Sequence, residues 1–268
     1  METVTYLFID GGYLNQAYVD SVKEWFGNEG EIDFSSVVSY YQPRKSFYYD
    51  CEDKLHRSGE SQSDYELRLK QQEIFFNRIR EIHGCHVRLG HLSGSGTKRR
   101  RQKEVDIRLT VDMMNHVIRR NMTNAILVSG DRDFKPLVES LVDMGIHITL
   151  AADARSVSKD LVYAADSFTG ITFEQYHYWS SSSLKSSYPI SNIRSINLPV
   201  AHADTLRIIK KGLVGSDTVT LYEAHNNLFY INVPLYKGQH TIALESNNAE
   251  RLELYFKLRY GSISWTQQ

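Results

Sequence analysis

The chain has 268 residues, 41% of them hydrophobic and 24% charged, which is the range of an ordinary globular protein with one sizeable core or a small second domain. Its net charge of −1 excludes a strongly basic nucleic-acid-binding protein, so any such affinity must come from local patches. No apolar run approaches the length of a membrane span, and the N-terminus lacks a signal peptide's basic region. Because Cys51 and Cys85 form neither a disulfide framework nor a zinc motif, we expect a cytoplasmic protein with free thiols.

The first predicted strand covers residues 4–9 and ends directly in Asp10, Gly11 and Gly12. A carboxylate at the carboxyl end of a buried strand lies where open α/β sheets bind their ligands. The two glycines allow the backbone to approach a ligand closely. The alternative interpretation is a turn in which Asp10 caps a helix.

The elements that follow alternate between helices and strands. Apolar residues recur at helical intervals after a capping box that begins at Ser63, and Gly84 ends that helix. Asp50 falls near the end of the second strand. In chain order we predict a helix over 32–41, a strand over 46–50, a polar loop over 51–62, a helix over 63–82 and a short strand over 87–89.

Residues 93–103 begin with glycine and serine and become strongly basic. We interpret this stretch as a flexible arm that contacts nucleic-acid phosphates, because it leads directly into the next acidic position. The alternative is a solvated surface loop. The five cations of the stretch are Lys98, Arg99, Arg100, Arg101 and Lys103.

A helix is predicted from residue 103 to about residue 119, with an apolar face near Asp106. Asp106 would lie in its first turn, where the helix dipole favours an anion, and this dipole effect is the alternative to a role in a site. Asp112 lies six residues further on, about 240° around the helix, so we expect it on a solvated or salt-bridged face.

Residues 126–134 carry the clearest chemical signal in the chain. An apolar run ends at Ser129 and gives way to Asp131 and Asp133. A helical pattern and a second apolar run over 146–150 follow, which predicts parallel strands joined by a right-handed crossover. Two carboxylates at the end of a buried strand repel each other unless a cation lies between them.

The last third of the chain changes character. Asp166 follows a predicted helix over 157–165 and either reaches the site or starts a turn before a β-prone run over 170–173. A serine-rich stretch over 179–190 predicts a linker. We expect residues 191–268 to form a small β-rich domain for oligomerisation or substrate binding. Its predicted elements are strands over 219–222 and 228–233 in a hairpin, a strand over 241–244, and a helix or strand over 251–260.

Asp10, the segment from Lys103 to Asp106, and the segment from Ser129 to Phe134 occur in the order typical of one family. Residues 1–178 resemble the NYN (LabA-like) domain, a branch of the PIN-fold nucleases. The resemblance implies a three-layer α/β/α domain with a mainly parallel central sheet. It also implies a metal-dependent phosphodiesterase that usually acts on RNA.

Two positions depart from the family pattern. The family often places asparagine where this chain has Gly12 or Tyr13, and Asn15 is the candidate to supply that polar contact. Glu104 stands where the family often has glycine. Neither change removes a carboxylate, so the resemblance implies that the metal site is retained.

We therefore predict a nuclease for single-stranded RNA, with DNA as a further possible substrate. Its Mg²⁺ or Mn²⁺ would be held by four carboxylates, and Tyr13 could stack on a base. The predicted metal ligands are Asp10, Asp106, Asp131 and Asp133. The predicted substrate contacts are Tyr13, Asn15, Lys98, Arg99, Arg100, Arg101, Lys103, Ser129 and Arg132.

Three other functions compete with this prediction. The first is a non-catalytic RNA-binding or regulatory module that keeps the fold. A phosphatase with a nucleophilic aspartate is disfavoured, because glycine occupies position 12, where a second acid would act. A dinucleotide-binding domain is disfavoured because no G-x-G-x-x-G follows the first strand.

Overall fold

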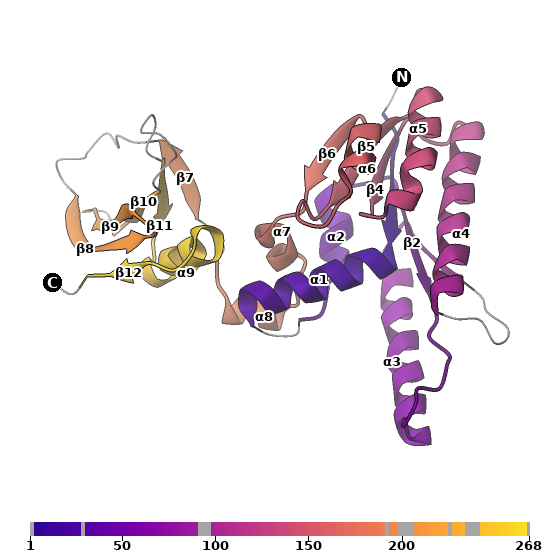
Figure 1. The fold of residues 1–268 in the computed structure, drawn as a ribbon, viewed down its shortest axis with the longest axis horizontal. Helices are drawn as coiled ribbons and strands as arrows, with labels where there is room; N and C mark the ends of the chain where they lie inside the picture. Colours follow the sequence, from indigo (N-terminus) through magenta and orange to yellow (C-terminus); the bar gives the residue numbers. More distant parts are fainter. Residues whose placement is uncertain are drawn as a thin grey trace. The chain divides into compact units, whose positions relative to one another are not determined.

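A computed structural model describes residues 3–27, 30–90, 98–190, 193–197, 206–224, 227–233 and 242–266. The chain divides into two compact units, Met1–Ser181 and Ser182–Gln268 (Figure 1). The division falls inside the serine-rich stretch that predicts a linker. Within this stretch Trp179 and Ser180 are fully buried, and Ser182–Ser187 forms the short helix α8.

The first unit is an α/β domain, as predicted, with helices on both faces of one sheet (Figure 1). Its strands are β1 (Thr5–Asp10), β2 (Lys45–Cys51), β3 (Cys85–Gly90), β4 (Asn124–Val128), β5 (His147–Ala152) and β6 (Ser167–Gly170). Its helices are α1 (Gly11–Phe26), α2 (Phe34–Tyr41), α3 (Gln62–Arg80), α4 (Lys98–Ile118), α5 (Lys135–Asp143), α6 (Lys159–Ala164) and α7 (Phe173–Tyr178), with a 3₁₀ turn, η1 (Arg132–Phe134).

The six strands pair in parallel in the order β3-β2-β1-β4-β5-β6. The chain moves outward from β1 to β3 and then returns to the other side of β1, so the order reverses between β1 and β4. Ligands of open α/β sheets bind at such a reversal, outside the carboxyl ends of the strands. Ile9 pairs with Val128, so Asp10 and Ser129 leave the sheet side by side.

The core of this unit lies on both sides of the sheet. The strands are apolar on both faces, as expected for parallel strands covered by helices. The predicted packed face of α4 is confirmed, because Leu109, Met113 and Val117 are all buried. Fully buried side chains of the sheet include Leu7, Phe8, Ile9, Leu127, Val128, Ile148 and Leu150.

Two helices begin at positions that the sequence analysis did not favour. A helix capped by Asp10 was only the alternative interpretation there, and that alternative is confirmed, because α1 starts at Gly11 with Asp10 as its cap. Helix α4 starts at Lys98, so the prediction of a flexible arm is wrong for the backbone of residues 98–103. Asp106 therefore lies two turns inside the helix instead of in its first turn. Residues 93–97, the remainder of that stretch, lie outside the described residues.

Two smaller boundaries also differ. The prediction of a strand over residues 170–173 is wrong, because β6 ends at Gly170 and α7 begins at Phe173. Helix α3 is capped by Ser61, whose side chain accepts a hydrogen bond from the backbone N–H of Asp64, and not by Ser63.

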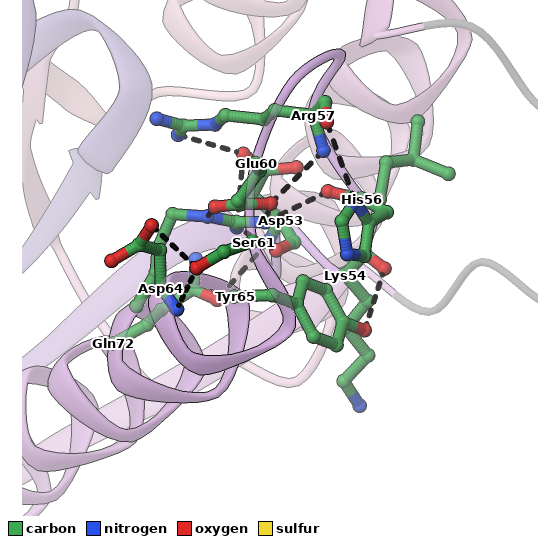
Figure 2. Close-up of polar contacts among 11 residues, drawn as sticks. Asp53, Lys54, His56, Arg57, Glu60, Ser61, Asp64, Tyr65 and Gln72 are labelled. Atoms are coloured by element: carbon green, nitrogen blue, oxygen red, sulfur yellow. Dashed lines mark hydrogen bonds and ion pairs between the residues drawn. The ribbon is translucent and has the colours of Figure 1, made fainter.

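The loop from β2 to α3 is an ordered polar network beside the carboxyl edge of the sheet (Figure 2). Arg68 of α3 donates to both carboxylate oxygens of Glu60, at 2.7 and 3.0 Å, and to the carbonyl oxygens of Asp53 and Leu55. One side chain on the helix therefore fixes the course of the loop that leaves β2.

Gly11 is required by its neighbours and not by its backbone angles. A Cβ at this position would lie 2.4 Å from the Cζ and the Oη of Tyr48 and 2.7 Å from the backbone oxygen of Tyr49. Because a backbone atom cannot move aside easily, we expect Gly11→Ala to lower the free energy of unfolding by about 1–3 kcal/mol, measured in urea. Gly170→Ala is the control, since its Cβ would meet its nearest neighbours at an ordinary 3.6 Å. Equal stability of the two variants would contradict this account.

The second unit is the predicted β-rich domain. Its strands are β7 (Arg194–Asn197), β8 (Arg207–Val214), β9 (Asp217–Glu223), β10 (Phe229–Val233), β11 (Ile242–Ser246) and β12 (Ser264–Trp265), and its second helix is α9 (Ala249–Tyr260). They form an antiparallel sheet in the order β12-β8-β9-β10-β11-β7. The hairpin of β9 and β10 is confirmed, and residues 251–260 prove helical and pack on β10 and β11.

None of the helices in the described ranges combines the length and the hydrophobicity that a membrane crossing requires.

Candidate functional site

A cavity of about 550 Å³ lies at the carboxyl ends of β1, β2 and β4. Helices α1 and α4 complete its wall, and five aspartates face it. The residues that line it are Asp10, Gly12, Tyr13, Gln16, Ala17, Asp20, Asp50, Cys51, Val105, Asp106, Gly130, Asp131 and Ser156. Three of the four predicted metal ligands are therefore brought together from distant parts of the sequence.

Asp10 is the most buried carboxylate of the site, with 5% of its surface exposed. It accepts hydrogen bonds from the backbone N–H of Tyr13 at 3.1 Å and from the Oγ of Ser129 at 2.9 Å. It is thus the cap of α1 as well as a wall of the cavity. The pKa of Asp10 is raised to about 6, chiefly by burial and also by the negative charges of Asp131 and Asp50, against the lowering effect of the two hydrogen bonds.

Asp131 follows β4 by three residues and caps the η1 turn. Its Oδ1 accepts from the backbone N–H of Asp133 at 2.9 Å, and its own backbone N–H donates to the Oγ of Ser129 at 3.2 Å. Ser129 is fully buried and joins Asp10 to Asp131. Asp133 is exposed and is not among the residues that line the cavity.

Asp50 is a site residue to which the sequence analysis assigned no role. It stands one position beyond Tyr49, the β2 partner of Asp10. Tyr48 donates its hydroxyl to Asp50 at 2.7 Å, and Asn15 donates to that hydroxyl at 2.8 Å and to Asp50 at 3.5 Å. Burial raises the pKa of Asp50. Its place at the end of a third parallel strand was the available signal.

Of the three remaining aspartates considered in the sequence analysis, one lines the cavity and two lie away from it. Asp106 lines the cavity from α4. Asp112 lies on another face of the same helix, where it accepts from the Tyr49 hydroxyl at 3.1 Å and pairs with Arg88 at 3.5 Å. Asp166 accepts from the backbone N–H of Ile148 at 2.8 Å, at the amino end of β5, and so lies at the opposite edge of the sheet.

The residues predicted to contact the substrate lie in different surroundings, unlike the acids that meet at the cavity. Asn15 donates a hydrogen bond to Asp50, and Ser129 donates one to Asp10, so both side chains contact acids of the site. Arg132 is exposed and pairs with Asp160 at 2.7 Å. The predicted contacts of the basic stretch lie in the first turns of α4, and their side chains lie outside the described part of the structure.

The donor chemistry of the cavity fits a hard divalent cation. Carboxylate oxygens suit Mg²⁺ and Mn²⁺. A cation would offset both the burial that chiefly raises the pKa of Asp10 and the repulsion from Asp131 and Asp50 that adds to it. Within the described ranges, no three His, Cys, Asp or Glu side chains lie close enough together to form a metal site alone. Mg²⁺ commonly binds through one or two carboxylates together with waters and substrate phosphates. The pair Asp10 and Asp131 would supply the protein ligands of such a site.

Among the comparisons with known proteins, the family match supports the fold. A family model of the NYN domain matches residues 5–172. A crystal structure of a protein of unknown function from Vibrio parahaemolyticus is 18% identical, with 67% of this chain and 97% of that chain covered and a TM-score of 0.48. A dehydrogenase from Clostridium difficile is 11% identical, with 100% of this chain and 84% of that chain covered and a TM-score of 0.23. No curated protein matches the chain.

Proposed function

Because the chain belongs to the NYN-domain family of the PIN-like nuclease superfamily, we propose that it is a metal-dependent nuclease that hydrolyses phosphodiester bonds in single-stranded RNA. One observation carries the proposal. The ends of three parallel strands and one helix bring Asp10, Asp50, Asp106 and Asp131 to a single cavity at the point where the strand order reverses.

Of these four carboxylates, Asp10 and Asp131 would hold Mg²⁺ or Mn²⁺ directly, and Asp50 and Asp106 would act through bound water. When bound, such an ion lowers the pKa of a water and stabilises the negative charge on a leaving oxygen. Ser129 and the backbone N–H of Tyr13 donate to Asp10 and so favour its charged, metal-binding form against the effect of burial. Asp133 is exposed, and we propose that it acts only through water.

The Tyr48 hydroxyl orients Asp50, which lines the cavity from the end of β2. It donates to one oxygen of Asp50, while the backbone N–H of Cys51 donates to the other at 2.7 Å. The hydrogen bond from Asn15 turns the hydroxyl toward Asp50. These contacts orient Asp50 toward the cavity, and we propose that Asn15 acts in this way and not by touching the substrate.

A single strand is the substrate that suits this cavity. The acids are recessed between α1 and α4, which favours a thin, flexible chain over a duplex. The basic run from Lys98 to Lys103 precedes Asp106 on the same helix, and Arg132 follows Asp131 directly. We propose that these cations bind the phosphates on either side of the bond that is cleaved.

A non-catalytic RNA-binding module is the second candidate function. It is favoured by the absence, within the described ranges, of three acidic, His or Cys side chains close enough together to hold a metal. The two functions differ in one measurable respect, because a binding module would retain RNA and leave it intact.

A cleavage assay on a panel of nucleic acids separates them. We expect the purified chain to cleave single-stranded RNA with Mg²⁺ or Mn²⁺, to cleave duplex RNA and DNA more slowly, and to lose all cleavage in EDTA. Cleavage restored by adding excess Mn²⁺ after EDTA would exclude damage to the protein. Binding of RNA without cleavage in either metal would instead establish the binding module.

A further inference from the structure

Tyr13 contacts the carboxyl ends of three neighbouring strands. Its backbone N–H donates to Asp10 at the end of β1. Its ring covers Gly130 after β4, because a Cβ at Gly130 would lie only 2.6 Å from Cε2 and 2.9 Å from Cζ of Tyr13. Its hydroxyl accepts a hydrogen bond at 2.9 Å from the backbone N–H of Asp153, which follows β5.

The contact at β5 is firmly anchored. Asp153 is 4% exposed and is bound by Arg155 through both of its carboxylate oxygens. Arg155 also donates to Ser21 and Glu24 of α1. The backbone that donates to the Tyr13 hydroxyl is therefore fixed to the same helix that carries Tyr13.

We propose that Tyr13 is a positioning residue that holds the turn of residues 129–131 against Asp10, so that Asp131 and Asp10 face the same point of the cavity. This role rests on the proposed function, and it takes the place of the base-stacking role predicted from the sequence. Tyr13 acts through Gly130 and makes no contact with the reacting atoms.

The geometry explains why both sides of the turn are needed. On one side the Oγ of Ser129 joins Asp10 to the backbone N–H of Asp131. On the other side the Tyr13 ring occupies the space that a side chain at position 130 would need. Asp131 therefore cannot move toward α1 while the ring is present. Without the ring, Asp131 is held by its hydrogen bonds to Ser129, Asp133 and Phe134, which do not block movement toward α1.

The test measures Mn²⁺ affinity of the full chain by calorimetry, and not activity. We expect Tyr13→Ala to weaken Mn²⁺ binding by roughly 10–100-fold, the usual effect of removing a residue that orients a metal ligand. Tyr13→Phe keeps the ring and loses only the hydrogen bond from Asp153, so it should weaken Mn²⁺ binding much less than Tyr13→Ala does. Tyr163→Ala is the control, because that tyrosine is 80% exposed on α6. Wild-type affinity in Tyr13→Ala would overturn the proposal.

A double-mutant cycle tests whether Tyr13 acts through Gly130. Gly130→Ala should weaken Mn²⁺ binding when the Tyr13 ring is present, because the added Cβ displaces the turn. It should have little further effect in Tyr13→Ala, where the space is open, so the two effects are not additive. Equal effects of Gly130→Ala in both backgrounds would contradict the proposed coupling.

The same cycle, measured in the free energy of unfolding in urea, separates this proposal from the proposed function. If the wild type neither binds Mn²⁺ nor cleaves RNA, the nuclease proposal fails. The contact between Tyr13 and Gly130 must still produce a coupling in the unfolding cycle. Additive effects on stability would then overturn the bracing role as well.

Discussion

Asp131→Asn is expected to reduce Mn²⁺-dependent cleavage of single-stranded RNA by roughly 100–1,000-fold, the usual cost of removing one electrostatic group from an active site. Asparagine keeps the size of the side chain and an oxygen that can accept from the backbone N–H of Asp133. The η1 turn should therefore persist, and only the charge in the cavity is lost. Initial rates at saturating Mn²⁺ measure the effect.

A matched control distinguishes a site effect from a general effect of lost charge. Asp143→Asn removes a carboxylate from the exposed end of α5 and should leave the rate unchanged. Circular dichroism of both variants should match the wild type. If Asp131→Asn retains the wild-type rate, Asp131 has no part in the chemistry.

Asp10→Asn is expected to abolish cleavage and yet stabilise the fold at pH 7.5 without metal. Burial raises the pKa of Asp10 from 3.8 to about 6, so the folded state binds this proton more tightly than the unfolded state does. The contribution of Asp10 to stability is therefore most favourable below pH 4, falls as the pH rises from about 4 to about 6, and stays unfavourable above that range. A shift of two units corresponds to about 3 kcal/mol, of which asparagine should recover about 1–3 kcal/mol.

Urea unfolding at several pH values checks this result. The difference between Asp10→Asn and the wild type should grow from pH 4 to pH 6 and then remain constant. Mn²⁺ at pH 7.5 should stabilise the wild type much more than the variant, because the variant lacks one of the carboxylates that hold the ion. A variant that is less stable than the wild type at pH 7.5 would contradict the account of Asp10 as a strained, functional charge.

The positions of Asp10 and Asp131 follow from a pattern that one sequence displays clearly. Each ends an apolar run, and parallel strands bring their carboxyl ends to one edge. Asp50 satisfies the same rule near the end of the predicted strand over 46–50, but the sequence alone does not show that this strand lies beside β1. Its role emerges only from the register of β1 with β2.

Asp133 shows the limit of reasoning from spacing alone. Two carboxylates one residue apart were expected to share a cation, but residues 132–134 form a 3₁₀ turn. Asp131 is the extended cap residue before this turn and Asp133 lies inside it, so the two side chains leave the backbone in different directions. Asp131 faces the cavity and Asp133 faces solvent.

Helix α1 was only the alternative interpretation because local preference and tertiary packing disagree. Gly11 and Gly12 disfavour a helix, and they dominate the local signal after Asp10. Packing reverses this preference, since Leu14, Tyr18 and Val22 recur every four residues and are all buried. In the second unit, β8 escaped prediction because Lys210, Lys211 and Gly212 interrupt the alternation that marks a strand.

The location of a bound metal tests the central claim most directly. Crystals of the wild-type chain soaked in Mn²⁺ should show an anomalous difference peak at the carboxyl ends of β1 and β4, in contact with Asp10 and Asp131, and the same soak of Asp131→Asn should show none. A peak elsewhere on the chain, or no peak in a wild-type protein that cleaves RNA with Mn²⁺, would contradict the carboxylate site proposed for this nuclease.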